Sequence, residues 1–140
     1  MSVKDTLSMY NANSTVLTIN NIRMYGFAPG STMAQMSWDN DRVVVEVDAQ
    51  GTPVPSQSNK DSATLTINLS QQSPSNAVLM SLSRSNASFP VDFRNGTEHW
   101  WGTQAYISKP ADMSDGDNAG TRAWTVKVLH ANFEAIEDGY

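Results

Sequence analysis

Residues 63–69 constrain the fold of this chain most, because apolar and polar side chains alternate there without a break. Three aliphatic side chains fall on one face of an extended segment, and threonine and asparagine fill the positions between them. A period of two places successive side chains on opposite faces of a β-strand, so one face is buried and the other exposed. The same period in Val43–Val47 and in residues 124–130 predicts two more half-buried strands.

Shorter runs of extended character between turn residues predict the remaining strands, at residues 14–20, 33–38, 89–94 and 101–109, and residues 22–27 continue the first of them in extended form. One segment has helical spacing instead. Ser73 can cap a helix, and Pro74 fits the first helical position, where its missing N–H is not needed. Its apolar side is formed by Ala77, Val78, Leu79 and Leu82, and the helix is expected to end near residues 84–86. About seven strands and one helix predict a mainly β fold.

Composition limits the classes of function. The 140 residues suit one domain, residues 1–140, and the chain has no cysteine for disulfides. Its net charge is −5 without a cluster of Lys and Arg, which argues against a protein that grips nucleic acid. The apolar runs are too short to span a membrane, and the polar N-terminus does not resemble a secretory signal. Ser, Thr, Asn and Gln make up 46 of the 140 residues, a composition that suits strand faces, turns and hydrated interfaces.

Periodicity stops between residues 49 and 62, where Gly51, Pro53 and Pro55 punctuate the chain. We therefore predict a long protruding loop without an apolar face of its own. Connections between adjacent strands are normally two to five residues long, so a loop of this length is expected to serve a function.

The two histidines are the obvious candidates for catalysis. His99 could act as a base oriented by Glu98, although a solvated histidine beside a turn is the more common situation. His130 follows the alternation of the last predicted strand, where a hydrogen-bonded strand histidine is the simpler interpretation. No catalytic residue is assigned.

The acidic loop near residue 116 has the oxygen ligands of a calcium site, in the residues Asp112, Asp115, Asp117 and Asn118. Their spacing does not match an EF-hand, so a solvated loop is favoured and no metal or cofactor is predicted. The four tryptophans, Trp38, Trp100, Trp101 and Trp124, could stack sugars or bases, but packing in a core or an interface is favoured.

Three segments resemble tail tube proteins of contractile-tailed bacteriophages. They are residues 26–31 (GFAPGS), residues 59–69 (NKDSATLTINL) and residues 71–79 (QQSPSNAVL). The similarity extends from about Thr15 to Phe133. Residues 1–10 show no clear match to the N-terminal arm of that family.

The resemblance implies two packed antiparallel β-sheets that form a partly open barrel with one flanking α-helix. It further implies a structural, non-enzymatic subunit of the virion, assembled in the host cytoplasm as hexameric rings that stack into a tube. Its partners would be other copies of itself, the sheath protein, the baseplate tube initiator and the tail terminator, without membrane insertion. DNA would pass through the lumen without specific binding.

Within this framework, residues 49–62 occupy the place of the ring-to-ring loop of the family. Gly51, Pro53, Val54 and Pro55 are the expected stacking residues, with Val54 as an apolar anchor at the tip. Four carboxylates are expected to line an acidic lumen that repels phosphates; they are Asp39, Asp41, Glu46 and Asp48.

An alternative of a different class is a carbohydrate-binding β-sandwich that acts in receptor binding or adhesion. It would use Trp100 and Trp101 as stacking platforms and requires both rings side by side on an exposed surface.

Overall fold

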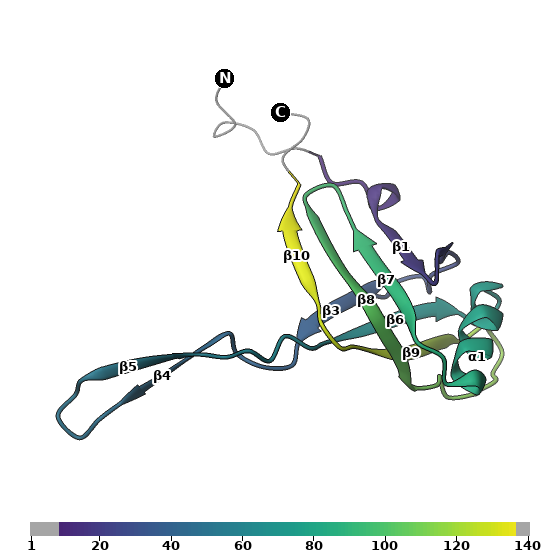
Figure 1. The fold of residues 1–140 in the computed structure, drawn as a ribbon. Helices are drawn as coiled ribbons and strands as arrows, with labels where there is room; N and C mark the ends of the chain where they lie inside the picture. The colour runs from purple at the N-terminus through teal and green to yellow at the C-terminus, as the bar shows by residue number, and fades with distance from the viewer. Residues whose placement is uncertain (1–8, 137–140) are drawn as a thin grey trace.

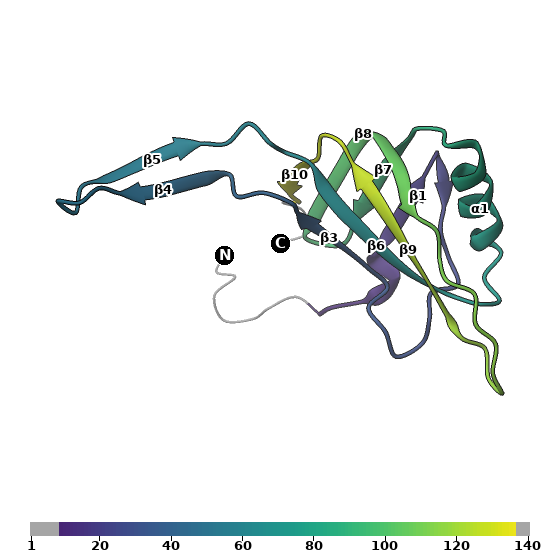
Figure 2. The ribbon, with the colours of Figure 1, turned by 90° about the horizontal axis from the view of Figure 1, so that it is seen from below.

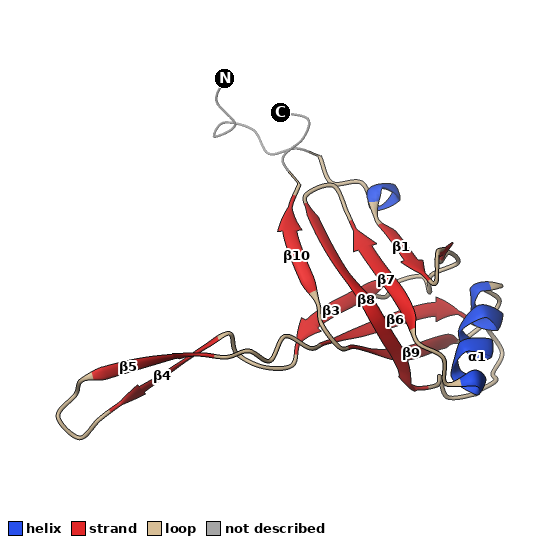
Figure 3. Ribbon diagram, in the orientation of Figure 1, coloured by secondary structure: helices blue, strands red, loops and turns tan. Residues whose placement is uncertain are grey.

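The computed structural model describes residues 9–136, and strands dominate this part of the chain (Figures 1 and 3). In chain order the strands are β1 (Val16–Ile19), β2 (Ile22–Arg23), β3 (Ala34–Trp38), β4 (Val43–Val47), β5 (Pro53–Gln57), β6 (Ala63–Ser70), β7 (Phe89–Arg94), β8 (Glu98–Lys109), β9 (Thr121–Val128) and β10 (Asn132–Ala135). The helices are a short 3-10 turn, Ala12–Ser14, and α1 (Ser75–Ser85). The predicted mainly β class is confirmed.

The strands form two antiparallel sheets. The larger one has eight strands in the order β2-β1-β7-β8-β9-β6-β3, with β10 paired to β8. This sheet curls so that the β1–β7 side lies across from the β3–β6 side (Figure 2). Its end strands β2 and β3 are not paired with each other in the described residues, so the barrel stays open. The expected arrangement of two antiparallel sheets, a partly open barrel and one α-helix is confirmed.

Strand β8 connects the two sides of the curled sheet. One of its edges pairs with β7 along residues 99–105. Its other edge pairs with β9 near Ala105 and with β10 near Trp101, because the chain bends at residues 129–131 and continues along the same strand. Gly102 lies at this bend, where a Cβ atom would be 2.3 Å from Cγ1 of Val128. The absence of a side chain permits the close approach.

The core lies inside the curled sheet and under α1. Its fully buried large residues are Trp124, Phe89, Leu17, Ile19, Met24, Leu65, Ile67, Leu69, Leu79, Val91, Val126 and Val128. Strand β6 alternates buried and half-buried residues over its whole length, as its sequence predicts. Burying each such aliphatic side chain contributes roughly 1.5–3 kcal/mol, so the free energy of folding comes from this body of the molecule.

Helix α1 differs from its predicted face. It buries Ser75, Asn76 and Leu79, whereas Ala77 is exposed. The Asn76 amide donates to the Ser70 carbonyl at 2.9 Å and accepts from the Trp124 indole N–H at 2.9 Å, so a polar side chain holds the helix on the sheet. Apolar spacing alone could not reveal this buried hydrogen bonding. The Ser73 hydroxyl accepts from the Ser75 N–H at 3.2 Å, but the helix begins one residue later than predicted, with Pro74 rather than Ser73 at the N-cap position. Its last residue is Ser85, within the predicted range, and Asn86 follows with φ +54°.

Strands β4 and β5 form a separate two-stranded sheet that extends away from the body (Figures 1 and 2). We call this hairpin, residues 43–57, the arm. The prediction of a loop without strands over residues 49–62 is wrong in this respect, because Pro53–Gln57 is a strand paired with β4. The tight turn occupies only the residues between Val47 and Pro53.

Other boundaries also differ from the prediction. The extended segment after Asn21 gives only the two-residue strand β2 and an isolated bridge between Phe27 and Leu69. The last predicted strand ends at Val128, and β10 follows it as an additional strand. Of residues 1–10, whose role the sequence leaves open, the first eight lie outside the described residues.

Candidate assembly surface

Backbone hydrogen bonds give the two edges of the arm different properties. The Asp48 N–H donates to the Thr52 carbonyl at 3.1 Å, and the Ser58 N–H donates to the Arg42 carbonyl at 2.8 Å. Hydrogen-bonded and non-hydrogen-bonded pairs alternate in an antiparallel ladder. Because these two pairs of even-numbered residues are hydrogen-bonded, the pairs of odd-numbered residues between them are not, and they direct their N–H and C=O groups away from the partner strand. Pro53 and Pro55 belong to these outward pairs, opposite Val47 and Val45.

This placement explains why two prolines are compatible with a strand. A proline nitrogen cannot donate, but at positions 53 and 55 the nitrogen points away from β4, so the hairpin loses no bond. The same prolines leave the outer edge of β5 short of donors. On β4 the outward N–H groups of Val43, Val45 and Val47 are intact, so the arm has one open edge and one blocked edge.

The side chains of the arm divide into two faces. Val43, Val45 and Val47 share one face with Pro53 and Pro55, and we call this surface the valine face. Its valines are 57–63% exposed. An isolated hairpin is at best marginally stable in water, and exposed apolar patches mark interaction sites. The valine face therefore has the character of a surface that another molecule covers.

The predicted stacking residues all lie on the arm, but not all at its tip. Gly51 is in the turn with φ +86°, a conformation that favours glycine. Val54 is in the middle of β5, opposite Glu46, and its side chain lies on the other side of the arm from the valine face. The tip is formed by residues 48–52, where the Asp48 carboxylate accepts from the N–H groups of Gln50 and Thr52, both at 2.9 Å.

The four predicted lumen carboxylates are not brought together as one cluster. Asp48 stabilises the turn at the tip, Glu46 lies on β4, and Asp41 is exposed in the connection between body and arm. Asp39 lies on the body and forms an ion pair with Lys127. The hydrogen bond from Lys127, followed by that from the Thr64 hydroxyl, lowers the pKa of Asp39 below its ordinary value.

An aromatic cluster fixes the root of the arm. Trp38, at the end of β3, packs against Trp100 and Phe133 with ring centroids 5.2 and 5.5 Å away. The Arg42 guanidinium lies 5.6 Å from the ring centroids of both Trp38 and Phe133. A polar hollow of about 340 Å³, lined by Arg42, Gln57, Lys60, Asp61, Asn132 and Phe133 among others, adjoins this point. Sequence spacing could not identify the cluster, because its members come from β3, β8 and β10.

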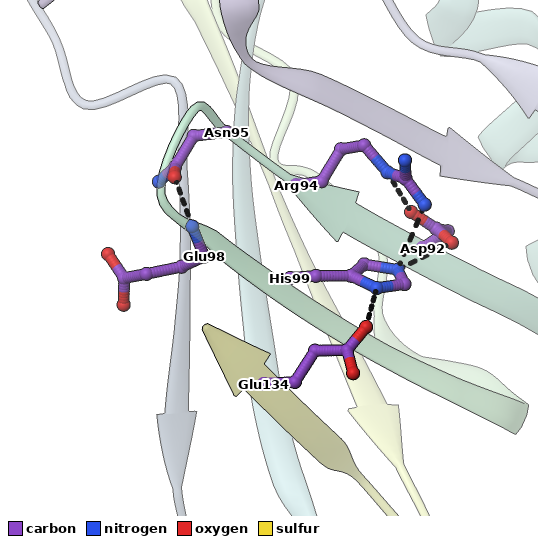
Figure 4. Close-up of polar contacts among 6 residues, drawn as sticks. All are labelled: Asp92, Arg94, Asn95, Glu98, His99 and Glu134. Carbon is purple, nitrogen blue, oxygen red and sulfur yellow. Dashed lines mark hydrogen bonds and ion pairs between the residues drawn. The ribbon is translucent and has the colours of Figure 1, made fainter. Parts of the chain in front are cut away.

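His99 has a different environment from the one predicted (Figure 4). Its ring nitrogens lie 2.9 Å from an Asp92 oxygen and 3.3 Å from a Glu134 oxygen, while the Glu98 side chain points away. The alternative in which Glu98 orients His99 is therefore excluded, and the favoured solvated histidine is also wrong, because the side chain is only 14% exposed. The contacts of His99 with Asp92 and Glu134 tie β7, β8 and β10 together on one face of the sheet.

His130 is hydrogen-bonded, but it lies beyond the end of β9 and is exposed. Its Nδ1 is 2.6 Å from the Asp61 carboxylate, and this hydrogen bond lowers the pKa of Asp61. In the acidic loop, Asp115 accepts from the Gln71 amide at 2.7 Å. Within residues 9–136, no three His, Cys, Asp or Glu side chains are grouped in a way that could hold a metal ion.

The tryptophans do not form the platform that carbohydrate binding requires. Trp100 packs against Trp38 on one face of β8, whereas Trp101 stacks on His99 at 4.6 Å. Adjacent residues of a strand point to opposite faces, so Trp100 and Trp101 cannot bind one sugar side by side. Trp124 is buried in the core. No helix in the described part of the chain is long and apolar enough to cross a membrane.

The chain has matches among solved protein structures but not among sequence families. No family model matches the chain, and no curated protein is significantly similar to it in sequence. A component of the PVC sheath–tube complex, an extracellular contractile injection system in the extended state, superposes with a TM-score of 0.61 at 10% identity. The match covers 91% of this chain and 93% of that one.

Two further solved structures have the same fold. The tube-terminating cap of the anti-feeding prophage gives a TM-score of 0.61 at 8% identity, over 97% of this chain and 100% of that chain. A chain from the PVC sheath/tube terminator complex gives 0.59 at 12% identity, over 92% and 99% of the two chains. The chain thus shares its fold with chains of a contractile sheath–tube complex, a tube-terminating cap and a sheath/tube terminator, and the resemblance noted in the sequence is confirmed at the level of fold.

Proposed function

We propose that this protein is a structural subunit of a contractile tail tube, which assembles through copies of itself into stacked rings. The observation that carries the proposal is the likeness of nearly the whole chain, over both its own length and theirs, to components of contractile injection systems. The arm supports it independently, because the valine face is exposed in the single subunit and exposed apolar patches mark interaction sites.

In the proposed assembly, six copies form each ring and DNA passes through the lumen. A net charge of −5 per chain disfavours contacts with phosphates, so DNA would slide rather than bind. Asp39, Asp41, Glu46 and Asp48 remain the proposed lumen residues.

Glu46 offers the cleanest test of an acidic lumen, since Asp48 also holds the turn and Asp39 is paired with Lys127. Glu46→Lys should leave tubes intact and slow genome delivery; delivery at the wild-type rate would contradict an electrostatic role for Glu46.

A tube terminator is the second candidate, because two of the matched structures come from a tube-terminating cap and a sheath/tube terminator. A tube subunit stacks without limit, whereas a terminator stops at one ring. Sheath, initiator and terminator proteins are the other proposed partners of the tube subunit, in a virion assembled in the host cytoplasm.

Negative-stain microscopy of the purified protein tests both candidates. Tubes of indefinite length are expected for the tube subunit, single rings for the terminator, and compact isolated particles would contradict the proposal. The matched control replaces residues 43–57 with a two-residue turn between Arg42 and Ser58, which already share a backbone hydrogen bond. This variant should fold, because the whole arm is exposed, but it should not stack into tubes.

A further inference from the structure

The described strands have five free edges, and most of them are protected against pairing. Natural proteins protect edges with short strands or proline. Strand β2 has two residues, β10 has four, and the outer edge of β5 carries Pro53 and Pro55. Strands β3 and β4 have five residues each, no proline, and a single charge in Glu46. These two edges are therefore the ones left open.

The outward groups of β3 can be identified in the same way as those of β4. The Asp39 N–H donates to the Ser62 carbonyl, and the Asn68 N–H donates to the Met33 carbonyl. The even-numbered residues between them, Ala34, Met36 and Trp38, therefore direct their N–H and C=O groups away from β6. The open edges of β3 and β4 thus offer three outward residues each.

We propose that β4 of one copy pairs with β3 of a second copy, in antiparallel orientation, with Val45 opposite Met36. This inference rests on the proposed self-assembly and names the contact that carries it. The donor must be another copy, because each arm leaves its own body directly after β3 and extends away from it (Figures 1 and 2).

The side chains support this register. Residues directly opposite in an antiparallel pair place their side chains on the same face. Ala34, Met36 and Trp38 pack against the core, so the opposing valines of the second copy would also face the core side. There, Met36 lines a hollow of about 130 Å³ with Phe93 and Trp100.

The open side of the barrel also favours an added strand. Strand β3 is the last strand of the curled sheet, and no strand within residues 9–136 pairs with its outer side. A second hollow of about 400 Å³, lined by Met33 and Phe27 among others, adjoins the chain just before β3. A donated β4 would cover the valine face and satisfy two open edges in one contact, while the prolines of β5 would prevent the sheet from growing further. Because the two edges differ, the contact is heterologous and can build rings or stacks.

Cysteine cross-linking tests the pairing directly, because the chain has no cysteine of its own. In the proposed register Val44 of one copy is opposite Ser37 of the next, at a non-hydrogen-bonded pair, where Cβ atoms lie about 4.5–5.5 Å apart. Val44→Cys and Ser37→Cys proteins are purified separately, mixed under conditions in which the wild-type protein assembles, and oxidised. A disulfide-linked dimer is expected only in the mixture.

The matched control is Ser56→Cys mixed with Ser37→Cys. Ser56 lies beside Val44 in the arm, but on the strand with the blocked edge, so it should cross-link weakly or not at all. Equal cross-linking of Ser56, or dimers from Val44→Cys alone, would overturn the proposed pairing. If the wild-type protein forms neither rings nor tubes, the proposed function fails; if tubes form without the Val44–Ser37 cross-link, only the strand pairing fails.

A second pair of variants separates the strand edge from the valine face. Val45→Pro removes one outward N–H and leaves the hydrogen bonds within the hairpin intact, whereas Val45→Ala keeps the N–H and shortens the side chain. Val45→Pro is expected to raise the protein concentration needed for assembly about tenfold relative to Val45→Ala, the size of effect that one lost backbone hydrogen bond produces. Equal assembly by the two variants would overturn the edge contact.

Discussion

The β3–β6 pair in the body and the β4–β5 pair in the arm are two stretches of the same long hairpin. In the body, every second residue of β6 is buried. In the arm, all residues of both strands are exposed, although β4 contains four valines. Apolar alternation therefore predicts that a strand forms, but burial depends on whether another layer of the same chain lies against it. In the arm, no other strand or helix of the described chain forms such a layer.

The junction between these two stretches changes the register by one residue. Ser62 pairs with Asp39 on the body side, and Ser58 pairs with Arg42 on the arm side. On the outgoing strand two residues, 40 and 41, lie between Asp39 and Arg42, whereas on the returning strand three residues, 59–61, lie between Ser58 and Ser62. An extra residue in one strand bends and twists a ladder, which gives the arm its own direction.

The largest expected contrast comes from equivalent truncations in the two stretches. Leu65→Ala, at a position that is 0% exposed, should lower the free energy of unfolding by about 2–5 kcal/mol. Val45→Ala, which is 58% exposed, should change it by less than about 0.5 kcal/mol in the dispersed subunit. Urea unfolding followed by circular dichroism measures both. A large effect of Val45→Ala on the dispersed subunit would show that the arm packs on its own body.

The stability of the body should also be sensitive to substitution of Gly102. In Gly102→Ala the new Cβ would lie 2.3 Å from Val128 Cγ1 and 3.0 Å from the His130 carbonyl oxygen. Relieving this contact moves β9 relative to β8, so the variant should lose about 1–3 kcal/mol. Gly51→Ala in the arm is a useful comparison, because its Cβ meets nothing within 4 Å and only the positive φ is unfavourable. Thermal unfolding compares the two; equal losses would contradict the steric explanation.

Arg42 lies between the two stretches and should have an intermediate effect. Removing its guanidinium in Arg42→Ala eliminates the contact with Trp38 and Phe133, which is worth about 0.5–1 kcal/mol at an exposed site. The orientation of the arm should become less defined, and the fluorescence of the Trp38 cluster should shift toward that of hydrated indole. Arg42→Lys keeps the charge and should retain part of the effect. An unchanged emission spectrum would show that the contact does not order the root.

The smallest effect is expected from the Asp39–Lys127 pair, worth about 0.2–1 kcal/mol. Folding lowers the pKa of Asp39 from its ordinary value of 3.8, so the folded state is stabilised above that value. This contribution is lost as the pH falls through the lowered pKa. Asp39→Asn should therefore reduce the dependence of unfolding free energy on pH below about 3.8. Lys127→Gln should act in the same direction, and additive effects of the two changes would contradict a direct pair.

The sequence predicts the fold well where one local pattern determines the structure. Residues 63–69 alternate and become β6, and the Ser73–Pro74 signal precedes α1. The strand β5 was missed because Pro53 and Pro55 normally break strands, and only the hydrogen-bond alternation shows that their nitrogens point outward. The partners of His99 were missed for another reason: Glu134 is 35 residues away, and its approach depends on the bend before β10.

The valine face also determines how temperature should act on any complex in which it is covered. Removing apolar surface from water lowers the heat capacity, so the driving force for association is mainly entropic near room temperature and weakens on cooling. Contacts between charged groups do not weaken on cooling in this way. An assembly held together through Val43, Val45 and Val47 should therefore be less stable in the cold than at room temperature, and it should lose subunits first on ice.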